Sequence, residues 1–168
     1  MGLVTVRPLL AVLLLGYAQI VHSDLQAHSQ SLGQHQLVLS NEQQQEHVFV
    51  LRSDQLTIVH FWASWCGPCR EELPSLNQFM QRFQPQGVRL VSIAADSHVK
   101  VRRFLQQTAV PGKILIDQYG RALRLFGVRG MPSSYILDRN GQVIYRAQAA
   151  VDWQDERVIE KIQRLLDP

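Results

Sequence analysis

Hydrophobic positions in this chain form two kinds of pattern, short continuous runs and stripes with helical spacing. The runs at 58–62 and 88–94 are rich in β-branched and aromatic residues, which is typical of buried strands. Between them, over 73–84, apolar residues recur at every third or fourth position, which predicts a helix. Pro85 and Gly87 follow this stripe and are expected to end the helix. The pattern therefore predicts a strand, a helix and a second strand.

The remaining patterned segments complete an α/β chain. Strands are expected at 47–51, 55–62, 88–94, 113–117, 133–137 and 142–147, and helices at 97–109, 121–126 and 153–166. Asn140 and Gly141 lie between the last two strands, and an Asn-Gly pair is a strong signal for an antiparallel hairpin. The predicted fold class is therefore α/β, with a central mixed β-sheet flanked by helices.

Residues 1–23 have the pattern of a secretory signal peptide. Arg7 precedes an uncharged apolar run at 9–21, and polar sequence follows. This run of about 13 residues is shorter than the roughly 20 residues that a membrane-spanning helix needs. Cleavage before Asp24 is expected, and an uncleaved N-terminal anchor that keeps the protein at the membrane is the alternative. Either outcome places the protein in the periplasm or otherwise outside the cytoplasm, after secretion across the inner membrane.

The next segment, 24–46, is polar and rich in glutamine, with few residues to bury. Such a composition predicts a flexible linker. The alternative is a short strand at 36–39 that pairs with the edge of the sheet. Residues 47–168 are then expected to form one domain, which is a chain long enough to bury a core.

Composition and charge exclude several functions. The net charge is +3 and the isoelectric point is about 9.1, but basic and acidic residues are interspersed, so no basic stripe for a nucleic acid is present. The histidines outside the central strand lack the spacing of metal ligands, and the sequence has no nucleotide or flavin motif. No cofactor, metal or nucleic acid partner is therefore expected.

Both cysteines of the protein, Cys66 and Cys69, lie at the junction between the central strand and the helix that follows it. The unpaired N–H groups and the positive end of the dipole at a helix start stabilise an anion, such as a thiolate. Cys66 is therefore expected to have a lowered pKa and to be the attacking thiol, with Cys69 as the resolving thiol. Between them, Pro68 needs no N–H in a first helical turn, and Gly67 leaves room for a partner. This arrangement indicates thiol–disulfide exchange.

The stretch Phe61-Trp62-Ala63-Ser64-Trp65-Cys66-Gly67-Pro68-Cys69 resembles the active-site strand and loop of the thioredoxin superfamily. Its continuation, Arg70-Glu71-Glu72-Leu73-Pro74, is more similar to the extracytoplasmic TlpA/ResA-like thiol–disulfide oxidoreductases. This resemblance extends from Leu56 to the C-terminus. It implies a thioredoxin fold in which the helix at 97–109 and the strand after it form the insertion typical of the TlpA/ResA group. Trp65 is expected to lie partly exposed beside the cysteines.

A second motif, Val128-Arg129-Gly130-Met131-Pro132-Ser133, precedes a strand far along the chain. It resembles the loop in which thioredoxin-like proteins place a cis-proline opposite the cysteine pair. The resemblance implies that Pro132 follows a cis peptide bond and that Met131 faces an extended substrate. A trans proline in an ordinary turn is the alternative.

Two titratable residues are candidates for proton transfer to or from Cys69. His60 lies where thioredoxin has a buried acid, and an imidazole can transfer a proton near neutral pH. Glu72 lies one helical turn after Cys69 and matches an acid of the TlpA/ResA group. Each also has a structural interpretation, His60 as a strand residue whose nitrogens are satisfied locally and Glu72 as an acid favoured by the helix dipole.

The cysteine pair is compatible with three functions. The first is an enzyme, a thiol–disulfide oxidoreductase acting on substrate proteins with disulfides or cysteine pairs. The others are a metal-binding module, for which a second pair of ligands is missing, and a binding module with a static disulfide, which would constrain only two intervening residues. The resemblance implies a reductase that receives electrons from a membrane thiol donor, with cytochrome c maturation as one setting. A disulfide oxidase or isomerase partner is the alternative direction.

Overall fold

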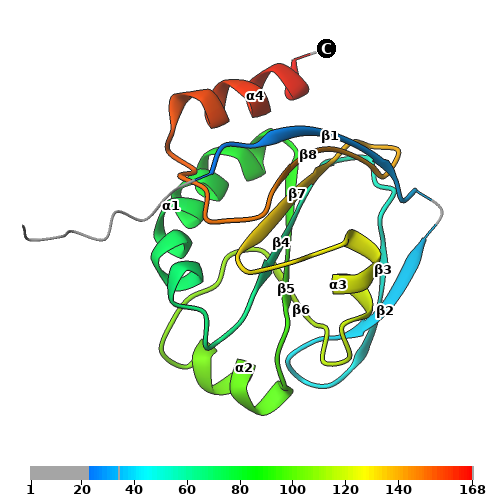
Figure 1. Ribbon diagram of the computed structural model, residues 1–168, viewed down its shortest axis with the longest axis vertical. Helices are drawn as coiled ribbons and strands as arrows, with labels where there is room; N and C mark the ends of the chain where they lie inside the picture. The colour runs from blue at the N-terminus through cyan, green and yellow to red at the C-terminus, as the bar shows by residue number, and fades with distance from the viewer. Residues whose placement is uncertain (1–22, 34, 168) are drawn as a thin grey trace, which may run out of the picture.

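A computed structural model describes residues 23–33 and 35–167 (Figure 1). An eight-stranded mixed sheet runs through it in the order β1-β8-β7-β4-β5-β6-β2-β3. The strands are β1 (Gln26–Ser31), β2 (Gln36–Ser40), β3 (Glu46–Val50), β4 (Leu56–Trp62), β5 (Val88–Ala94), β6 (Lys113–Ile116), β7 (Ser133–Leu137) and β8 (Gln142–Ala147). The helices are α1 (Gly67–Phe83), α2 (His98–Leu105), α3 (Arg121–Phe126) and α4 (Glu156–Leu166), with a 3₁₀ turn η1 (Gln84–Gln86) after α1. The predicted mixed sheet flanked by helices is confirmed.

The central strand β4 is buried along its whole length, as its apolar sequence predicts. It pairs in parallel with β5, which pairs in parallel with β6, and it pairs antiparallel with β7. Parallel strands end at the same edge of a sheet, so the loops after β4, β5 and β6 lie together. The two cysteines follow β4 and therefore lie at this edge.

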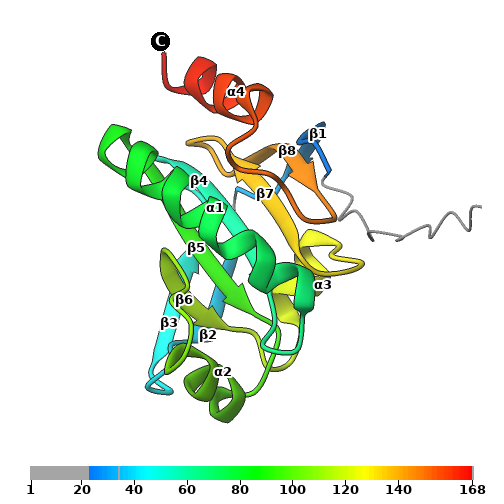
Figure 2. The same cartoon turned by 90° about the vertical axis from the view of Figure 1, so that its left-hand side faces the viewer.

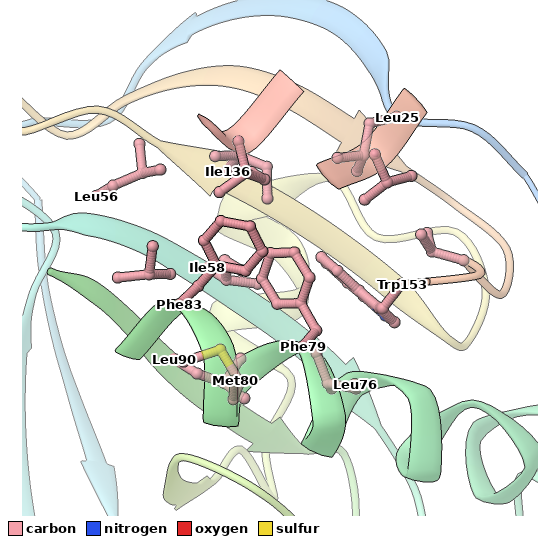
Figure 3. Close-up of a cluster of buried hydrophobic side chains, with 14 of the residues drawn as sticks. Leu25, Leu56, Ile58, Leu76, Phe79, Met80, Phe83, Leu90, Ile136 and Trp153 are labelled. Carbon is pink, nitrogen blue, oxygen red and sulfur yellow. The ribbon is translucent and has the colours of Figure 1, made fainter. Parts of the chain in front are cut away.

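Helices cover both faces of the sheet. Because side chains alternate along β4, Ile58 belongs to a core cluster with α1 and α4, whereas Val59 and Phe61 pack with residues of α3 on the opposite face. Figure 2 shows α1 lying along one face of the sheet. Figure 3 shows the first cluster, in which Phe79, Phe83 and Trp153 meet. Burial of these large apolar side chains is the main force that fixes α1 against the sheet.

The prediction of a flexible linker at 24–46 is wrong, because this segment contributes two strands. β1 pairs antiparallel with β8 at one edge of the sheet, and β2 joins β6 to β3 at the other. The alternative of a short strand at 36–39 is confirmed. The physical reason is a small number of well-spaced apolar side chains that the polar composition obscures. They are Leu25, Leu32, Leu37 and Leu39, all buried.

The β2–β3 turn contains no glycine. Asn41 Oδ1 accepts hydrogen bonds from the backbone N–H groups of Gln43 and Gln45, at 3.1 and 2.9 Å. Gln44 supplies the left-handed backbone conformation of the turn, with φ of 67°. A short polar side chain thus closes the hairpin.

Two predicted helix boundaries differ from the structure. The helix expected at 97–109 ends at Leu105, because the Phe104 carbonyl accepts from the N–H groups of Gln107 and Thr108, both at 3.0 Å, and closes the chain into a turn. The last helix begins at Glu156, after Asp155 as its N-cap, so Trp153 lies before it rather than in its first turn. The strands predicted from 47 onward and the helix at 121–126 fall within one residue of the prediction, and α1 ends one residue before the predicted end.

The predicted signal peptide lies at 1–23, and all of it except Ser23 is outside the described residues. Over 23–33 and 35–167, no helix combines the length and the apolar character needed to cross a membrane.

Candidate active site

Cys66 is the N-cap residue of α1. Its backbone is extended, with φ of −83° and ψ of 108°, and its Sγ accepts a hydrogen bond from the backbone N–H of Cys69 at 3.2 Å. Pro68, in the first turn, lacks an N–H that would otherwise need a partner. The Cys66 sulfur therefore lies where the N–H groups and the helix dipole stabilise negative charge, as the sequence predicts.

Cys66 and Cys69 form a disulfide with an S–S distance of 2.07 Å. Both are nearly inaccessible, with 3% and 1% of their surfaces exposed. The residues around them are open to solvent: Trp65 is 63% exposed, and a Cβ added at Gly67 would meet no atom within 4 Å. A partner chain can therefore approach the disulfide over Trp65 and Gly67.

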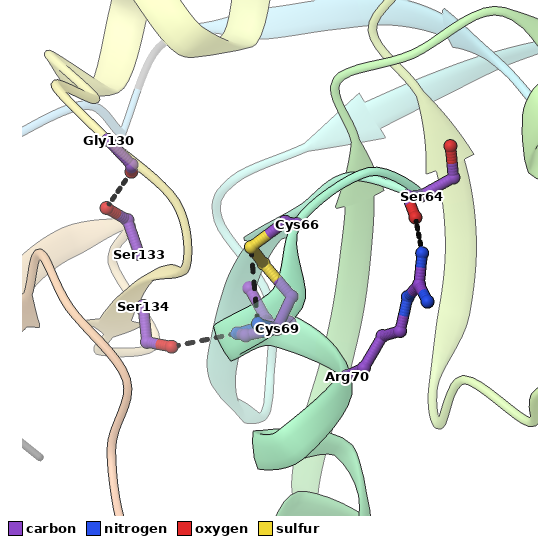
Figure 4. The surroundings of a disulfide bond; sticks show 8 residues. Ser64, Cys66, Cys69, Arg70, Gly130, Ser133 and Ser134 are labelled. Carbon is purple, nitrogen blue, oxygen red and sulfur yellow. Dashed lines mark hydrogen bonds between the residues drawn. A yellow bond between two sulfur atoms is a disulfide. The ribbon is translucent and has the colours of Figure 1, made fainter. Parts of the chain in front are cut away.

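The second predicted motif lies against the first. The Met131–Pro132 peptide bond is cis, and Met131 packs against the buried cluster that contains both cysteines. The Ser133 hydroxyl donates a hydrogen bond to the Gly130 carbonyl at 2.7 Å, which ties the two ends of the loop together. Figure 4 shows this loop facing the cysteine pair. The structure thus joins two motifs that are more than sixty residues apart in the sequence.

His60 is fully buried on β4, on the same sheet face as Ile58 and Trp62. Its Nδ1 lies 3.0 Å from the Ser134 hydroxyl, and its Nε2 has no hydrogen-bond partner among the described residues. Burial lowers the pKa of His60 from 6.5 to about 4, because the charged imidazolium loses its solvation. The ring is therefore neutral at physiological pH.

Glu72 is buried in α1, with 1% of its surface exposed. Burial raises the pKa of its carboxyl from 4.5 to about 8, and hydrogen bonds from the Trp153 side chain and the Val151 backbone offset this only in part. The Trp153 indole donates to Glu72 Oε1 at 2.6 Å, while Oε2 has no partner among the described residues. Glu72 is therefore mostly protonated at neutral pH.

The sequence-predicted site residues fall into two layers. The outer layer contains Trp65, Gly67 and Pro68, which are exposed, and the loop of Met131 and Pro132, which are half-buried and buried. The inner layer contains the buried His60 and Glu72. The structure adds Ser134 and Trp153, the partners of these two residues, which sequence analysis did not select because only contacts distant in sequence identify them.

Over the described part of the chain, no group of three or more His, Cys, Asp or Glu side chains is arranged to hold a metal ion. The reactive groups that the structure describes here are the Cys66–Cys69 disulfide and the buried side chains of His60 and Glu72.

The chain is similar to a known family and to thiol-disulfide oxidoreductases. A model of the AhpC/TSA family matches residues 35–146. The thiol-disulfide oxidoreductase ResA of Bacillus thuringiensis subsp. konkukian is 31% identical over 87 residues, which are 51% of this chain and 50% of that protein. The chain thus spans about half the length of the curated relatives that it matches.

Solved structures share the fold. A protein from Chlorobium tepidum described as a thiol:disulfide interchange protein, DsbE, superposes with a TM-score of 0.73 at 27% identity, covering 84% of this chain and 99% of that one. The thioredoxin domain of a thiol-disulfide oxidoreductase from Bacteroides vulgatus superposes with a TM-score of 0.69 at 13% identity, covering 84% of this chain and all of that one, 100%. The predicted thioredoxin fold is confirmed.

Proposed function

The chain belongs to the AhpC/TSA family, and we propose that it is an extracytoplasmic thiol–disulfide oxidoreductase that reduces disulfides in other proteins. The observation that carries this proposal is the position of Cys66 Sγ at the N-cap of α1, where it forms a disulfide with Cys69. A sulfur in this position leaves as a stabilised thiolate and attacks as one.

The reaction starts from the reduced protein. The Cys66 thiolate attacks one sulfur of a substrate disulfide, so a mixed disulfide forms and the other substrate sulfur leaves as a thiolate. The Cys69 thiolate then attacks Cys66 Sγ, which releases the second substrate sulfur and forms the Cys66–Cys69 disulfide. Two electrons pass from the protein to the substrate, and the two substrate thiolates take up protons. The structure corresponds to the oxidised product of this cycle.

Substrate binding is assigned to the outer layer of the site. Trp65 offers an exposed aromatic surface beside Cys66, and Gly67 and Pro68 leave the approach open. On the other side, the backbone of Met131 precedes a proline and is available to an extended chain, which would pair with it as an added strand. These contacts hold the substrate sulfur against Cys66.

Proton transfer is assigned to the inner layer. Glu72 lies one turn after Cys69 on the same face of α1. A carboxyl with a pKa of about 8 is closely matched to a thiol, because proton transfer is most efficient between groups of similar pKa near the working pH. We therefore propose that the ionised fraction of Glu72 accepts the proton of Cys69, and this fraction grows as the pH rises toward 8. His60 is the second candidate, since its unpartnered Nε2 lies in the same buried layer.

The compartment and the partners complete the proposal. The apolar leader at 9–21 supports action outside the cytoplasm, after secretion across the inner membrane, with or without an N-terminal anchor. In such an oxidising compartment a reductase has to be reduced again after each turnover, and a membrane thiol donor would supply the electrons. Its substrates are proteins with disulfides or cysteine pairs, and cytochrome c maturation is one setting in which such pairs must be kept reduced.

Trapping the mixed disulfide tests this function. The Cys69→Ser variant lacks the resolving thiol, so it is expected to accumulate covalent adducts with substrate proteins in an extract of extracytoplasmic proteins, visible as bands that disappear on reduction. The matched control is Cys66→Ser, which is expected to form none. Equal adducts with both variants, or with neither, would contradict the assigned cycle.

A further inference from the structure

A basic pocket lies beside the disulfide, between the start of α1 and the helix α2. Its volume is about 180 Å³. It is lined by Ser64, Arg70, Lys100, Arg103, Phe104 and Gln107. We keep the name basic pocket for these six residues. Ser64 lies two residues before Cys66, and Arg70 directly follows Cys69, so the pocket adjoins the reacting sulfur atoms along the chain.

Arg70 is held in place on one wall of the basic pocket. Its guanidinium donates to the Ser64 carbonyl at 2.8 Å, as Figure 4 shows, and it lies 5.6 Å from the centre of the Phe104 ring. Phe104 in turn packs against Trp62 of the central strand, with ring centres 5.0 Å apart. The wall is therefore anchored to the core and keeps its shape when a ligand arrives.

The positive charge of the basic pocket exceeds the negative charge beside it. Three cations line it, and among the described residues the acid that forms an ion pair with one of them is Asp96, whose carboxylate lies 3.6 Å from Lys100 Nζ. Asp96 is buried and already accepts from the Ser64 hydroxyl at 2.5 Å and from the Ser97 N–H at 2.9 Å. Arg103 is exposed, and its guanidinium makes no hydrogen bond or ion pair with the described residues. Its charge is thus available to a ligand.

We propose that the basic pocket binds an acidic side chain next to the target disulfide of a substrate protein, and so selects substrates whose cysteines are flanked by Asp or Glu. This inference rests on the proposed exchange function and narrows its substrate class. A carboxylate in the pocket would face Arg103 and Lys100, and the side chain's methylene groups would contact Phe104. Complementary charge of this kind raises the association rate and sets the register of the partner.

A protein segment fits this place better than a membrane surface. The pocket is concave and is lined by Ser64 and Arg70, which lie close to Cys66 and Cys69 in the chain. A bound side chain would therefore hold its own neighbouring disulfide near the attacking sulfur, whereas a lipid headgroup would compete with substrate at the same entrance. Exposed ion pairs each contribute little to binding. The preference for an acidic flank is therefore expected to be about three- to tenfold and to fall as salt screens it.

The test uses three disulfide-bonded peptides that differ only in the residues flanking the cysteines, which are Glu, Gln or Lys. With the protein kept reduced by a chemical thiol, kcat/KM is expected to fall in the order Glu, Gln, Lys at low salt and to converge at high salt. Arg103→Gln is expected to abolish the preference for Glu over Gln. The matched control is Arg102→Gln, which removes an equally exposed charge from the same helix outside the basic pocket. Arg103→Glu is expected to shift the preference toward the Lys peptide.

The outcomes separate the inference from the proposed function. Equal turnover of the three peptides by the unmodified protein would overturn the inference and leave the exchange function standing. Turnover of no peptide would overturn the exchange function, and the inference with it. Binding to vesicles of an anionic phospholipid that depends on Arg103, without any peptide preference, would assign the pocket to a lipid and overturn the inference.

Discussion

The indole N–H of Trp153 donates to Glu72 Oε1 at 2.6 Å, and both side chains are buried. The two residues are 81 positions apart, one in α1 and the other just before α4. The contact fixes one oxygen of a carboxyl whose other oxygen has no partner among the described residues. It links the segment before α4 to Glu72, the proposed acceptor of the Cys69 proton.

Glu72→Gln tests the raised pKa of this carboxyl through stability. The pKa of about 8 in the folded state exceeds the unfolded value of 4.5, so the fold favours the protonated form. The stability that this gives is fully present below pH 4.5 and is lost as the pH rises through 8. The free energy of unfolding of the unmodified protein is therefore expected to fall relative to the variant over this range, at most by about 1.4 kcal/mol per pH unit. Urea unfolding at pH 4 to 9 measures the difference, and parallel curves would contradict the raised pKa.

The same substitution tests the proton-transfer role of Glu72. A glutamine cannot exchange a proton, so exchange at neutral pH is expected to slow by roughly 10- to 100-fold, toward the lower end of what a positioned acid or base contributes. In the unmodified protein the exchange rate is expected to rise near pH 8 as Glu72 ionises, and in the variant this rise is expected to disappear. Stopped-flow measurements of disulfide reduction against pH check both effects. If His60→Asn, and not Glu72→Gln, removes the rise of the exchange rate with pH, the proton of Cys69 is transferred to His60.

Trp153→Phe tests whether the indole N–H positions Glu72. The ring packing against Phe79, with centres 5.1 Å apart, can be kept, while the donor is lost. Because the hydrogen bond from Trp153 lowers the pKa of Glu72, its removal is expected to raise that pKa and to move the pH dependence of exchange upward. The stability cost is expected to be about 1 to 3 kcal/mol. Adding Trp153→Phe to Glu72→Gln should give no further shift in the pH profile, and an additional shift would assign Trp153 a separate role.

Burial of His60 is expected to make the free energy of unfolding fall as the pH is lowered, which is the opposite of the effect of Glu72. Its pKa is about 4 in the folded state against 6.5 when unfolded, so its contribution to stability is present above pH 6.5 and is lost as the pH falls through 4. Glu72 titrates with the opposite sign in an overlapping range, so the test is made in the Glu72→Gln background. There, the protein is expected to lose stability between pH 6.5 and 4, and His60→Asn is expected to flatten this loss. An unchanged slope would show that His60 is not buried as a neutral group.

The N-terminal strand β2 provides a matched pair of substitutions. Leu39 is 5% exposed and its neighbour Val38 is 43% exposed. Leu39→Ala is expected to lower the free energy of unfolding by about 2 to 4 kcal/mol, whereas Val38→Ala should change it by no more than about 0.5 kcal/mol. If both substitutions had equally small effects in denaturant unfolding, the packing of β2 against the sheet would be contradicted.

Sequence patterns predicted the centre of this fold better than its edges. The buried strand β4 and the Asn140–Gly141 hairpin have strong local signals, and both were located correctly. β1 has no such signal, because its own residues are mainly polar and the burial that fixes it comes from Leu25 and Leu32 on either side. Pairing at a sheet edge depends on a partner strand elsewhere in the chain, which no local pattern encodes.

In the candidate site, too, local motifs could be predicted from the sequence and contacts between distant residues could not. Cys66 and Pro132 lie in short motifs, so their positions could be predicted from the sequence. The pairing of Trp153 with Glu72, and of Ser134 with His60, arises only when distant elements pack together. The basic pocket is likewise formed where α1 and α2 lie side by side. The position of Arg103 near the start of α1 therefore could not be predicted from the sequence.

The central claim, that Cys66 and Cys69 form a redox centre that donates electrons to protein disulfides, is tested most directly by the reduction potential of the pair. The purified protein is equilibrated in glutathione and dithiothreitol buffers, and tryptophan fluorescence follows the redox state, since Trp62 packs in the same cluster as the cysteines. A reducing potential is expected, near the roughly −270 mV of thioredoxin. A potential near the roughly −120 mV of a strong disulfide oxidant, or a disulfide that does not titrate, would contradict it.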